Sequence, residues 1–319
     1  MSVNGRNGAR EMSTNDPADG GIGVSYSGSQ RFAVEISGSY DAPDAFRDAL
    51  ERVTDVHGPI EVGFFLPAMV RPDKSGTVVV PQRLACILKN HLLLLSLETD
   101  SHRAAALLTD RSHLLGYRIT GFLLDCWITV FQSCTPREIP IQFPVQSGEL
   151  YSVFIKALFH KNVFPSSSVQ TPVHHSVLSL NCPAPFIRFL HQHPELGEFR
   201  DASLQTAVPF GRTRRQKCTN LLLATTDNAM IALTDEEPFG ASWLGLRVTY
   251  VLLHSVARVE WIDQFHLQQG VLFLYIGSGG NLLRLEWSLA MRFRRAALEW
   301  IENLNSALAQ RTVTNERSI

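Results

Sequence analysis

Four basic side chains lie close together in the segment GRTRRQKC, residues 211–218. They are Arg212, Arg214, Arg215 and Lys217, whereas the 319-residue chain as a whole has a formal net charge of only −1. Arginine and lysine form charge-assisted hydrogen bonds with phosphate and carboxylate groups. The cluster is therefore the candidate binding site for an anion, above all for anionic lipid head groups. The alternative is a solvated loop tip whose charges keep a nearby edge strand from pairing with other chains.

Other residues that carry chemistry do not form a recognisable site. His174, His175, His191 and His193 offer imidazole groups, but no cysteine or acidic cluster stands at metal-ligand spacing beside them. The glycine-rich segment 277–280 lies between two expected strands and does not open a helix, as a phosphate cradle must. The sequence contains no G-x-S-x-G motif. We therefore predict that the protein is not an enzyme and has no catalytic residues, no metal site and no cofactor.

The composition gives no indication of nucleic-acid binding. A net charge of −1 and a pI near 6.8 produce no overall field that attracts a polyanion. Tryptophan rings could stack on bases, but their spacing fits the core faces of strands and of a helix. The residues concerned are Trp243, Trp261, Trp287 and Trp300. We predict that the partner is a protein or peptide, with anionic lipid as the alternative, and that the protein does not bind nucleic acid. The sequence leaves the oligomeric state open.

The chain ends and the cysteines bear on location. Residues 1–30 are rich in Gly, Ser, Asn and Asp and lack the apolar segment of a signal peptide, so we expect a disordered tail there and a second one at 312–319. No apolar run approaches the roughly 18 residues of a membrane-spanning helix. The five cysteines include no C-x-x-C pair, which favours reduced thiols. We expect a cytoplasmic protein, with peripheral association at a membrane as the alternative.

A repeated pattern indicates how the chain is organised. The stretch LKNHLLLLSLETD matches TTDNAMIALTDEE, so that Asn90 meets Asn228 at an offset of 138 residues. The same offset brings Asp125 onto Asp263, and later segments match at about 142. We interpret these two carboxylates as turn residues at the ends of equivalent strands, one in each half, and not as a catalytic pair. Upstream, PDAFRDAL and PAPFIRFL match more weakly.

Hydrophobic periodicity predicts the content of each half. The runs RLACILKNHLLLLSL, YRITGFLL, CWITVFQ and EIPIQFPV are short, apolar or alternating, and typical of antiparallel strands. GVLFLYIGSGGNLLRLEW predicts a hairpin with glycines in its tight loop. Each half then changes to helical spacing. The apolar positions are Tyr151, Phe154, Ile155, Leu158 and Phe159 after the possible N-cap Ser147, and Phe293, Ala297, Trp300, Ile301, Leu304 and Leu308.

This order of elements resembles the bacterial PH-like and GRAM-like domains. The resemblance is carried by LGEFRDASLQTAVPF, LLLATTDNAMIALTDEE and GGNLLRLEWSLAMRFRRAALEWI, over residues 195–310, and less well over 58–160. It implies an α+β fold of two tandem PH-like units, each a bent antiparallel β-barrel or sandwich of about six or seven strands closed by a C-terminal amphipathic helix. We expect the units at 31–160 and 183–311, with a connector rich in Pro and Ser at 161–182.

The resemblance also bears on function. In PH-like domains that bind phosphoinositides, basic residues between the first two strands hold the head group, and the cluster at 212–217 falls at about that position. The matching segment of the first half, RPDKSGTVV, has only two basic residues. We predict a non-enzymatic interaction or scaffold protein whose two PH-like modules bind a protein or peptide partner. The alternative is a peripheral membrane adaptor that binds anionic lipid head groups through residues 212–217.

Overall fold

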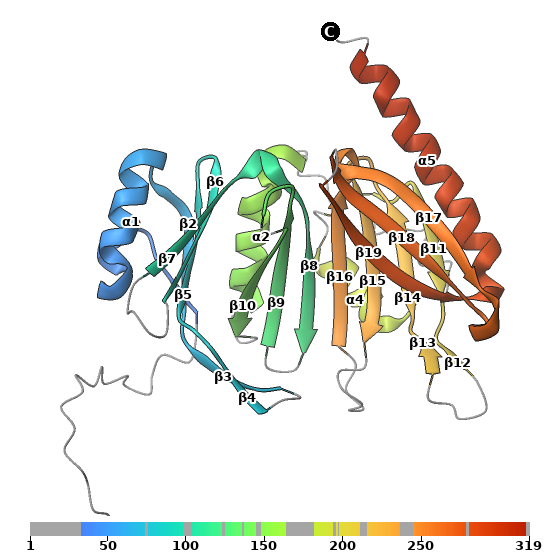
Figure 1. The fold of residues 1–319 in the computed structure, drawn as a ribbon, viewed down its shortest axis with the longest axis horizontal. Helices are drawn as coiled ribbons and strands as arrows, with labels where there is room; N and C mark the ends of the chain where they lie inside the picture. Colours follow the sequence, from blue (N-terminus) through green and yellow to red (C-terminus); the bar gives the residue numbers. More distant parts are fainter. Residues whose placement is uncertain are drawn as a thin grey trace, which may run out of the picture. The chain divides into compact units, whose positions relative to one another are not determined.

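A computed structural model gives the fold of the chain (Figure 1). It describes residues 33–73, 76–97, 104–122, 125–135, 137–144, 148–163, 182–193, 196, 198–210, 216–236, 245–278 and 281–316. The predicted N-terminal tail and most of the predicted connector lie outside these residues. Residues 31–319 form one compact unit.

Antiparallel strands make up most of this unit. The first sheet has the order β1 (Val34–Glu35), β2 (Ile60–Leu66), β5 (Arg83–Leu88), β6 (His91–Leu97) and β7 (Ala104–Asp110). The central sheet has the order β10 (Glu138–Pro144), β9 (Asp125–Gln132), β8 (Leu114–Phe122), β16 (Gly245–Leu252), β15 (Ala229–Glu236), β14 (Leu221–Thr225) and β11 (Asp201–Gln205). The third sheet has the order β17 (Val256–Gln264), β18 (Gln269–Ser278) and β19 (Asn281–Ala290). Two short ribbons are formed by β3 (Met69–Asp73) with β4 (Gly76–Val80), and by β12 (Val208–Phe210) with β13 (Gln216–Cys218).

The predicted α+β class with mainly antiparallel sheets is confirmed, but the sheets are not the predicted pair of separate units, each a closed barrel or sandwich. The described strands form three larger sheets, and none of these closes on itself. The central sheet combines strands from both halves, because β8 pairs with β16 from Gly116↔Val251 to Gly121↔Leu246. Figure 1 shows these two strands side by side in the middle of the unit. Their edges therefore bond to each other and do not close a barrel within either half.

Gly116 permits the close approach of β8 to β16, which we call the seam. A Cβ atom at this position would lie 2.2 Å from the carbonyl oxygen of Tyr250 and 2.9 Å from the Cα atom of Val251. Its φ of +156° is also one that side-chain-bearing residues rarely adopt. A β-bulge accompanies it, since Leu114 pairs with Gln132 but Gly116 pairs with the preceding residue of β9. The seam thus depends on a residue without a side chain.

Within the described residues, four α-helices cover the sheets. One core contains α2 (Gly148–Val163), α4 (Ala184–Gln192) and one face of the central sheet. Tyr117 and Tyr250, which are opposite each other in the seam, stack there with ring centroids 5.0 Å apart. A second core joins α1 (Asp44–His57) to the first sheet. The third core joins α5 (Arg294–Glu316) to the third sheet and to β8, β9, β14, β15 and β16 of the central sheet, with Trp287 and Trp300 buried in it.

Most predicted strands and helices lie where the periodicity places them. The hairpins β5–β6, β14–β15 and β18–β19 coincide with the quoted segments, and α2 and α5 carry the predicted apolar positions, although Phe293 precedes α5 in a 3₁₀ turn. α1 and α4 are absent from the predicted elements. Both follow a proline N-cap, Pro43 and Pro183, and these residues lie in the weakly matching segments PDAFRDAL and PAPFIRFL. A proline at a helix start is a signal that could have identified them. Ser147 and Trp243 lie outside the described residues.

The predicted equivalence of Asp125 and Asp263 is wrong. β5 and β14 begin 138 residues apart, but the 3₁₀ helices η2 (Arg111–His113) and η5 (Leu253–Ser255) begin 142 residues apart. The extra residues therefore precede β16, and the ungapped offset ends earlier than the sequence suggests. As a result, Asp125 begins β9, whereas Asp263 lies near the end of β17.

Candidate functional site

The predicted basic site falls largely outside the described part of the chain. Arg212, Arg214 and Arg215 belong to the undescribed residues 211–215, between β12 and β13. Lys217 lies in β13, where the structure describes the backbone alone. The anion-binding role of these four residues therefore stays a prediction, and the structure contributes the surroundings of the ribbon that carries them.

A buried glutamine holds the base of the β12–β13 ribbon. The Nε2 atom of Gln205 donates to the carbonyl oxygens of Thr219, at 2.9 Å, and Ser288, at 3.4 Å. Its Oε1 atom accepts a hydrogen bond from the backbone N–H of Ala290, at 2.7 Å. Buried amide groups with all their partners hold neighbouring strands in fixed positions. The base of the ribbon is thus tied to the C-terminal end of β19.

An exposed apolar turn lies between β17 and β18. Its 3₁₀ helix η6 (Phe265–Leu267) leaves Phe265 71% exposed and Leu267 36% exposed, and Ile262 at the end of β17 is 49% exposed. Gln268 ends the turn in the left-handed conformation, with φ of +51°. The turn and its flanking residues read QFHLQQ, residues 264–269. Neither this turn nor its exposed aromatic side chain is predicted from the sequence.

The apolar turn and the ribbon base adjoin through the residues that precede and begin α5. The backbone N–H of Met291 donates to the carbonyl oxygen of Gln268 at 3.1 Å. The Nη2 atom of Arg292 donates to the hydroxyl of Thr206 at 3.3 Å, two residues before β12. We call Phe265, Leu267, Arg292 and Arg294 the corner surface.

Asp263 fixes one side of the corner surface. Its Oδ1 atom accepts hydrogen bonds from Arg294 Nε, at 3.0 Å, and from Trp261 Nε1, at 2.6 Å. The bond from Arg294 is the main reason that the pKa of Asp263 is lowered from its ordinary value, and the bond from Trp261 adds to it. Gly270 makes room for the Trp261 ring, because a Cβ atom there would overlap the ring.

The described strands that end the three larger sheets are β1 and β7 in the first, β10 and β11 in the central, and β17 and β19 in the third. No described strand pairs with the outer sides of β7 and β17. β7 reads AAALLTD, and its Ala105 and Ala106 are exposed. In β17 only Val256 is buried. Free backbone N–H and C=O groups along an edge strand are a template for pairing with another strand.

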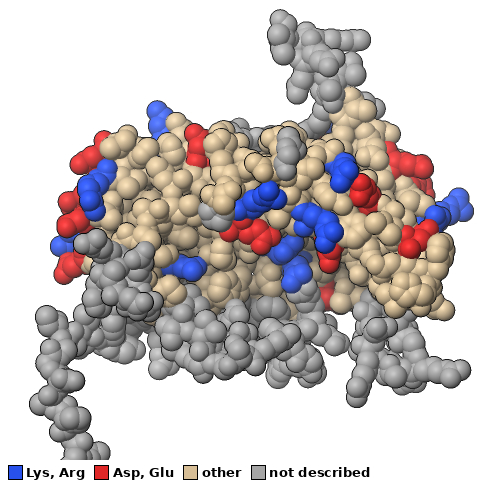
Figure 2. Space-filling model, viewed as in Figure 1, with Lys and Arg blue, Asp and Glu red and all other residues tan. Residues whose placement is uncertain are grey.

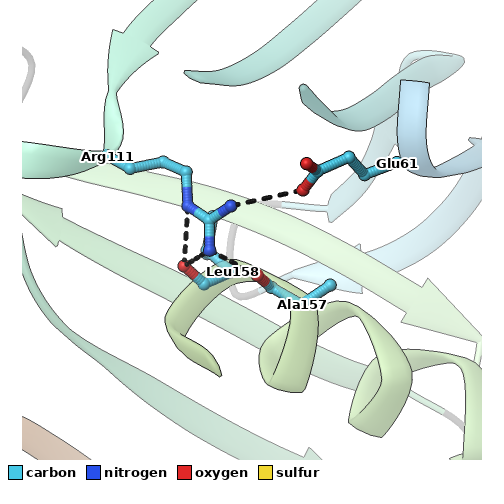
Figure 3. A network of polar contacts seen from close by, with 4 residues as sticks. All are labelled: Glu61, Arg111, Ala157 and Leu158. Carbon is cyan, nitrogen blue, oxygen red and sulfur yellow. Dashed lines mark hydrogen bonds and ion pairs between the residues drawn. The ribbon is translucent and has the colours of Figure 1, made fainter. Parts of the chain in front are cut away.

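A buried arginine fixes the junction between β7 and β8. The Nε and Nη2 atoms of Arg111 donate to the carbonyl oxygen of Leu158, at 3.1 and 2.8 Å, and Nη2 also donates to that of Ala157 (Figure 3). Its Nη1 atom lies 3.5 Å from a carboxylate oxygen of Glu61. Burial lowers the pKa of Arg111, and the Glu61 charge opposes this effect. The contacts tie η2, and with it the end of β7, to α2 and β2.

The histidines and cysteines do not assemble into a site among the described residues. No group of three or more His, Cys, Asp or Glu side chains is placed there to hold a metal ion. His193 is buried and stacks on Phe189 with ring centroids 4.2 Å apart, and His191 is exposed on α4. His174 and His175 lie outside the described residues.

Charges of both signs alternate on the visible face. Figure 2 shows basic side chains gathered near the middle of this face with acidic side chains among them. On β17, Arg258 lies 3.2 Å from Glu260, and on β19, Arg284 lies 3.5 Å from Glu286. Exposed pairs of this kind contribute little to stability. They do keep the third sheet from presenting a field of one sign.

Comparison of the chain with models of known protein families gives no match, and comparison with curated proteins gives none either. Among the described residues, no helix has both the length and the apolar character needed to cross a membrane.

Proposed function

We propose that this protein is a non-enzymatic interaction module that binds a protein or peptide partner by strand addition to β7. The observation that carries the proposal is the free, almost uncharged edge of this strand. An extended peptide that adds to such an edge gains affinity from main-chain hydrogen bonds and specificity from alternate side chains. The contacts of Arg111 hold this edge in a defined position at its C-terminal end.

The two edges of the central sheet are less suited to strand addition. β10, at one edge of the central sheet, contains Pro140 and Pro144, which have no N–H group to donate. β11, at the other edge, has five residues, and Asn303 of α5 donates to Asp201 at its start. β7 has neither proline nor a basic residue, the usual means by which proteins protect an edge.

From the PH-like resemblance, we keep the two related units but not the closed barrels. We infer that the chain is a tandem of two related units that share the central sheet, without closed barrels. In support, the hairpins β5–β6 and β14–β15, the 3₁₀ helices η2 and η5, and the helices α2 and α5 follow in the same order. In this alignment β7 corresponds to β16, and β8 corresponds to β17.

The test is site-specific photo-crosslinking in the native cell. A photoreactive amino acid replaces Ala105, and in the matched control it replaces Val56, which is 75% exposed on α1. We expect a discrete adduct at Ala105 that is absent at Val56. Equal adducts at both positions, or none at Ala105, would contradict strand addition at β7.

A second function, peripheral membrane binding, is favoured by the corner surface. The turn with the exposed Phe265 and Leu267 is linked through the consecutive residues Met291 and Arg292 to Thr206, two residues before the ribbon that carries residues 212–217. Each basic residue near an anionic surface contributes about 1 kcal/mol, and an exposed aromatic side chain can enter the interface.

This second function is tested by co-sedimentation with vesicles of graded anionic lipid content. We expect binding to fall with salt and to be lost when Arg212, Arg214, Arg215 and Lys217 are all replaced by Ser. Phe265→Ser should weaken binding even at high anionic content, whereas the control Val56→Ser should not. Native protein that stays in the supernatant at low salt would exclude membrane binding through this site.

A further inference from the structure

The two strands of the seam are buried, but their counterparts at the ends of the unit are exposed. In β16, six of the eight residues are buried, whereas β7 has only Thr109 buried. In β8, Tyr117 and Ile119 are buried, whereas β17 leaves Ile262 49% exposed and Trp261 half-buried. Within the described chain, β8 and β16 therefore pair with each other, whereas their counterparts β17 and β7 have no strand paired on the corresponding edge.

The hydrophobic cores show the same difference. The core at the seam is continuous across both halves, because α2 and α4 lie on the same face of the central sheet. Each of the other two cores contains one of the remaining helices, α1 or α5. Their margins carry partly buried apolar side chains of the free strands: Ala104 and Leu108 of β7, and Val259 and Trp261 of β17. At the seam, two paired strands and two helices share one core. The α1 core with β7 and the α5 core with β17 each contain one strand and one helix of an arrangement of this kind.

We propose that a second copy of this chain is the partner, with β17 of one copy pairing antiparallel with β7 of the next. This inference rests on the proposed strand addition at β7 and on the tandem correspondence of β7 with β16 and of β8 with β17. Pairing of the two free edges brings the α5 core of one copy next to the α1 core of the other. In the same way, the seam brings α2 of the first half and α4 of the second half into one core.

The seam also supplies the register. In the seam, Tyr117 pairs with Tyr250 and Ile119 pairs with Val248. Adding the 142-residue spacing of η2 and η5 to the β8 residue, and subtracting it from the β16 residue, gives the corresponding pair between copies. The resulting pairs are Val259 with Leu108 and Trp261 with Ala106. Both transferred pairs are apolar, and the small Ala106 leaves room for the Trp261 ring. On the opposite face, the half-exposed Ile262 faces the exposed Ala105.

The transferred pairing ends before Arg258. This residue takes the place of Gly116, where a Cβ atom would lie 2.2 Å from a carbonyl oxygen of the facing strand. Among the described residues other than glycine, only Gln268 has a positive φ, so Arg258 does not have the conformation of Gly116. The pairing between copies therefore covers residues 259–263 opposite 104–108, which is shorter than the seam. A shorter pairing makes the association weaker and reversible.

The symmetry of this contact predicts the kind of assembly. The two surfaces, β17 and β7, differ, so the contact is heterologous, and each bound copy leaves one of each edge free. Such contacts produce open chains or closed rings rather than a dimer that stops at two copies.

The experiment is analytical ultracentrifugation of the full-length protein with one edge blocked at a time. Ala105→Glu blocks β7 and Ile262→Glu blocks β17, because each buries a charge at the contact. Both positions are exposed, and the thermal unfolding of each variant is compared with that of the native chain to verify folding. Val56→Glu on α1 is the matched control.

We expect the average mass of the native chain and of Val56→Glu to rise with concentration beyond twice the chain mass. Each blocked variant alone should remain at one chain mass. An equimolar mixture of the two should reach twice the chain mass and stop there, because it retains one intact β17 and one intact β7. In addition, Ala105→Cys and Ile262→Cys, on separate copies, should form a disulfide on mild oxidation, since directly opposed Cβ atoms lie within about 5.5 Å.

Two results would overturn the inference. One is a native chain that stays at one chain mass at every concentration; the other is a blocked mixture that does not associate. A monomeric chain that still gives an adduct with another protein at Ala105 in cells refutes self-association and leaves the proposed function standing. A monomeric chain with no adduct at Ala105 refutes both.

Discussion

Replacement of Gly116 by alanine tests whether the seam holds the two halves together. The added Cβ atom would lie 2.2 Å from the Tyr250 carbonyl oxygen, well below the 3.4 Å of an ordinary contact, so β8 and β16 must move apart. The φ of +156° adds backbone strain for a residue with a side chain. We therefore expect a large loss of stability from a change of one methyl group.

The magnitude follows from these two terms. Overpacking of a well-packed site costs about 1–3 kcal/mol, and a residue held in an unfavourable backbone region costs about 1–3 kcal/mol more. The change Gly116→Ala should accordingly lower the free energy of unfolding by about 2–6 kcal/mol. Because Tyr117 stacks on Tyr250 next to this position, near-ultraviolet circular dichroism should change as well.

Urea denaturation measures the effect, and Gly121→Ala is the matched control. Gly121 lies on the same strand and pairs across the same seam, but a Cβ atom there would contact only the Leu246 carbonyl oxygen at 3.9 Å. We expect this control to lie within about 0.5 kcal/mol of the native chain. Equal effects of the two substitutions, or a loss below about 1 kcal/mol for Gly116→Ala, would show that β8 and β16 do not approach as described.

Three further predictions concern other parts of the unit. Trp300→Ala should cost about 3–5 kcal/mol in urea denaturation, because the ring is buried between α5 and the sheets, and a loss under about 1 kcal/mol would mean that α5 is undocked. The pKa of Asp263 is lowered by Arg294, so its carboxylate stabilises the folded state above the ordinary aspartate pKa, and this contribution disappears as the pH falls through the lowered value. Asp263→Asn should therefore reduce the loss of stability on acidification below about pH 4, and an unchanged acid profile would exclude this role. A thiol reagent should label exposed Cys134 in the native chain and buried Cys86, whose pKa is raised by burial, only after unfolding, so rapid native labelling of Cys86 would contradict the described core.

The candidate site could be predicted from the sequence only in part. A dense group of four cations is visible in the composition of residues 211–218 without any structure. The apolar turn at Phe265 was not identified, because a sequence does not show whether an aromatic side chain is buried or exposed. The link between the two, through Arg292 and Thr206, joins residues 86 positions apart and depends on how β11 and β19 meet.

Local patterns determined the elements and therefore the fold class. Alternation in segments such as EIPIQFPV produces strands, and the spacing of Trp300, Ile301 and Leu304 produces a helix, because the period of each element decides which side chains share a face. Hairpins such as β5–β6 and β14–β15 follow from the same local information, since their strands are joined by two or three residues. These features need no contact between distant parts of the chain.

Only the tertiary structure decided which strand edges meet. The sequence of each half is compatible with closure on itself, and Gly116 differs from any other glycine only through the strand that lies opposite it. Its partner, Val251, is 135 residues away, and pairing over such a separation depends on the balance of all other contacts. The seam, the continuous core beneath it and the free edges of β7 and β17 all result from that choice, because an edge is free only when no other strand has paired with it.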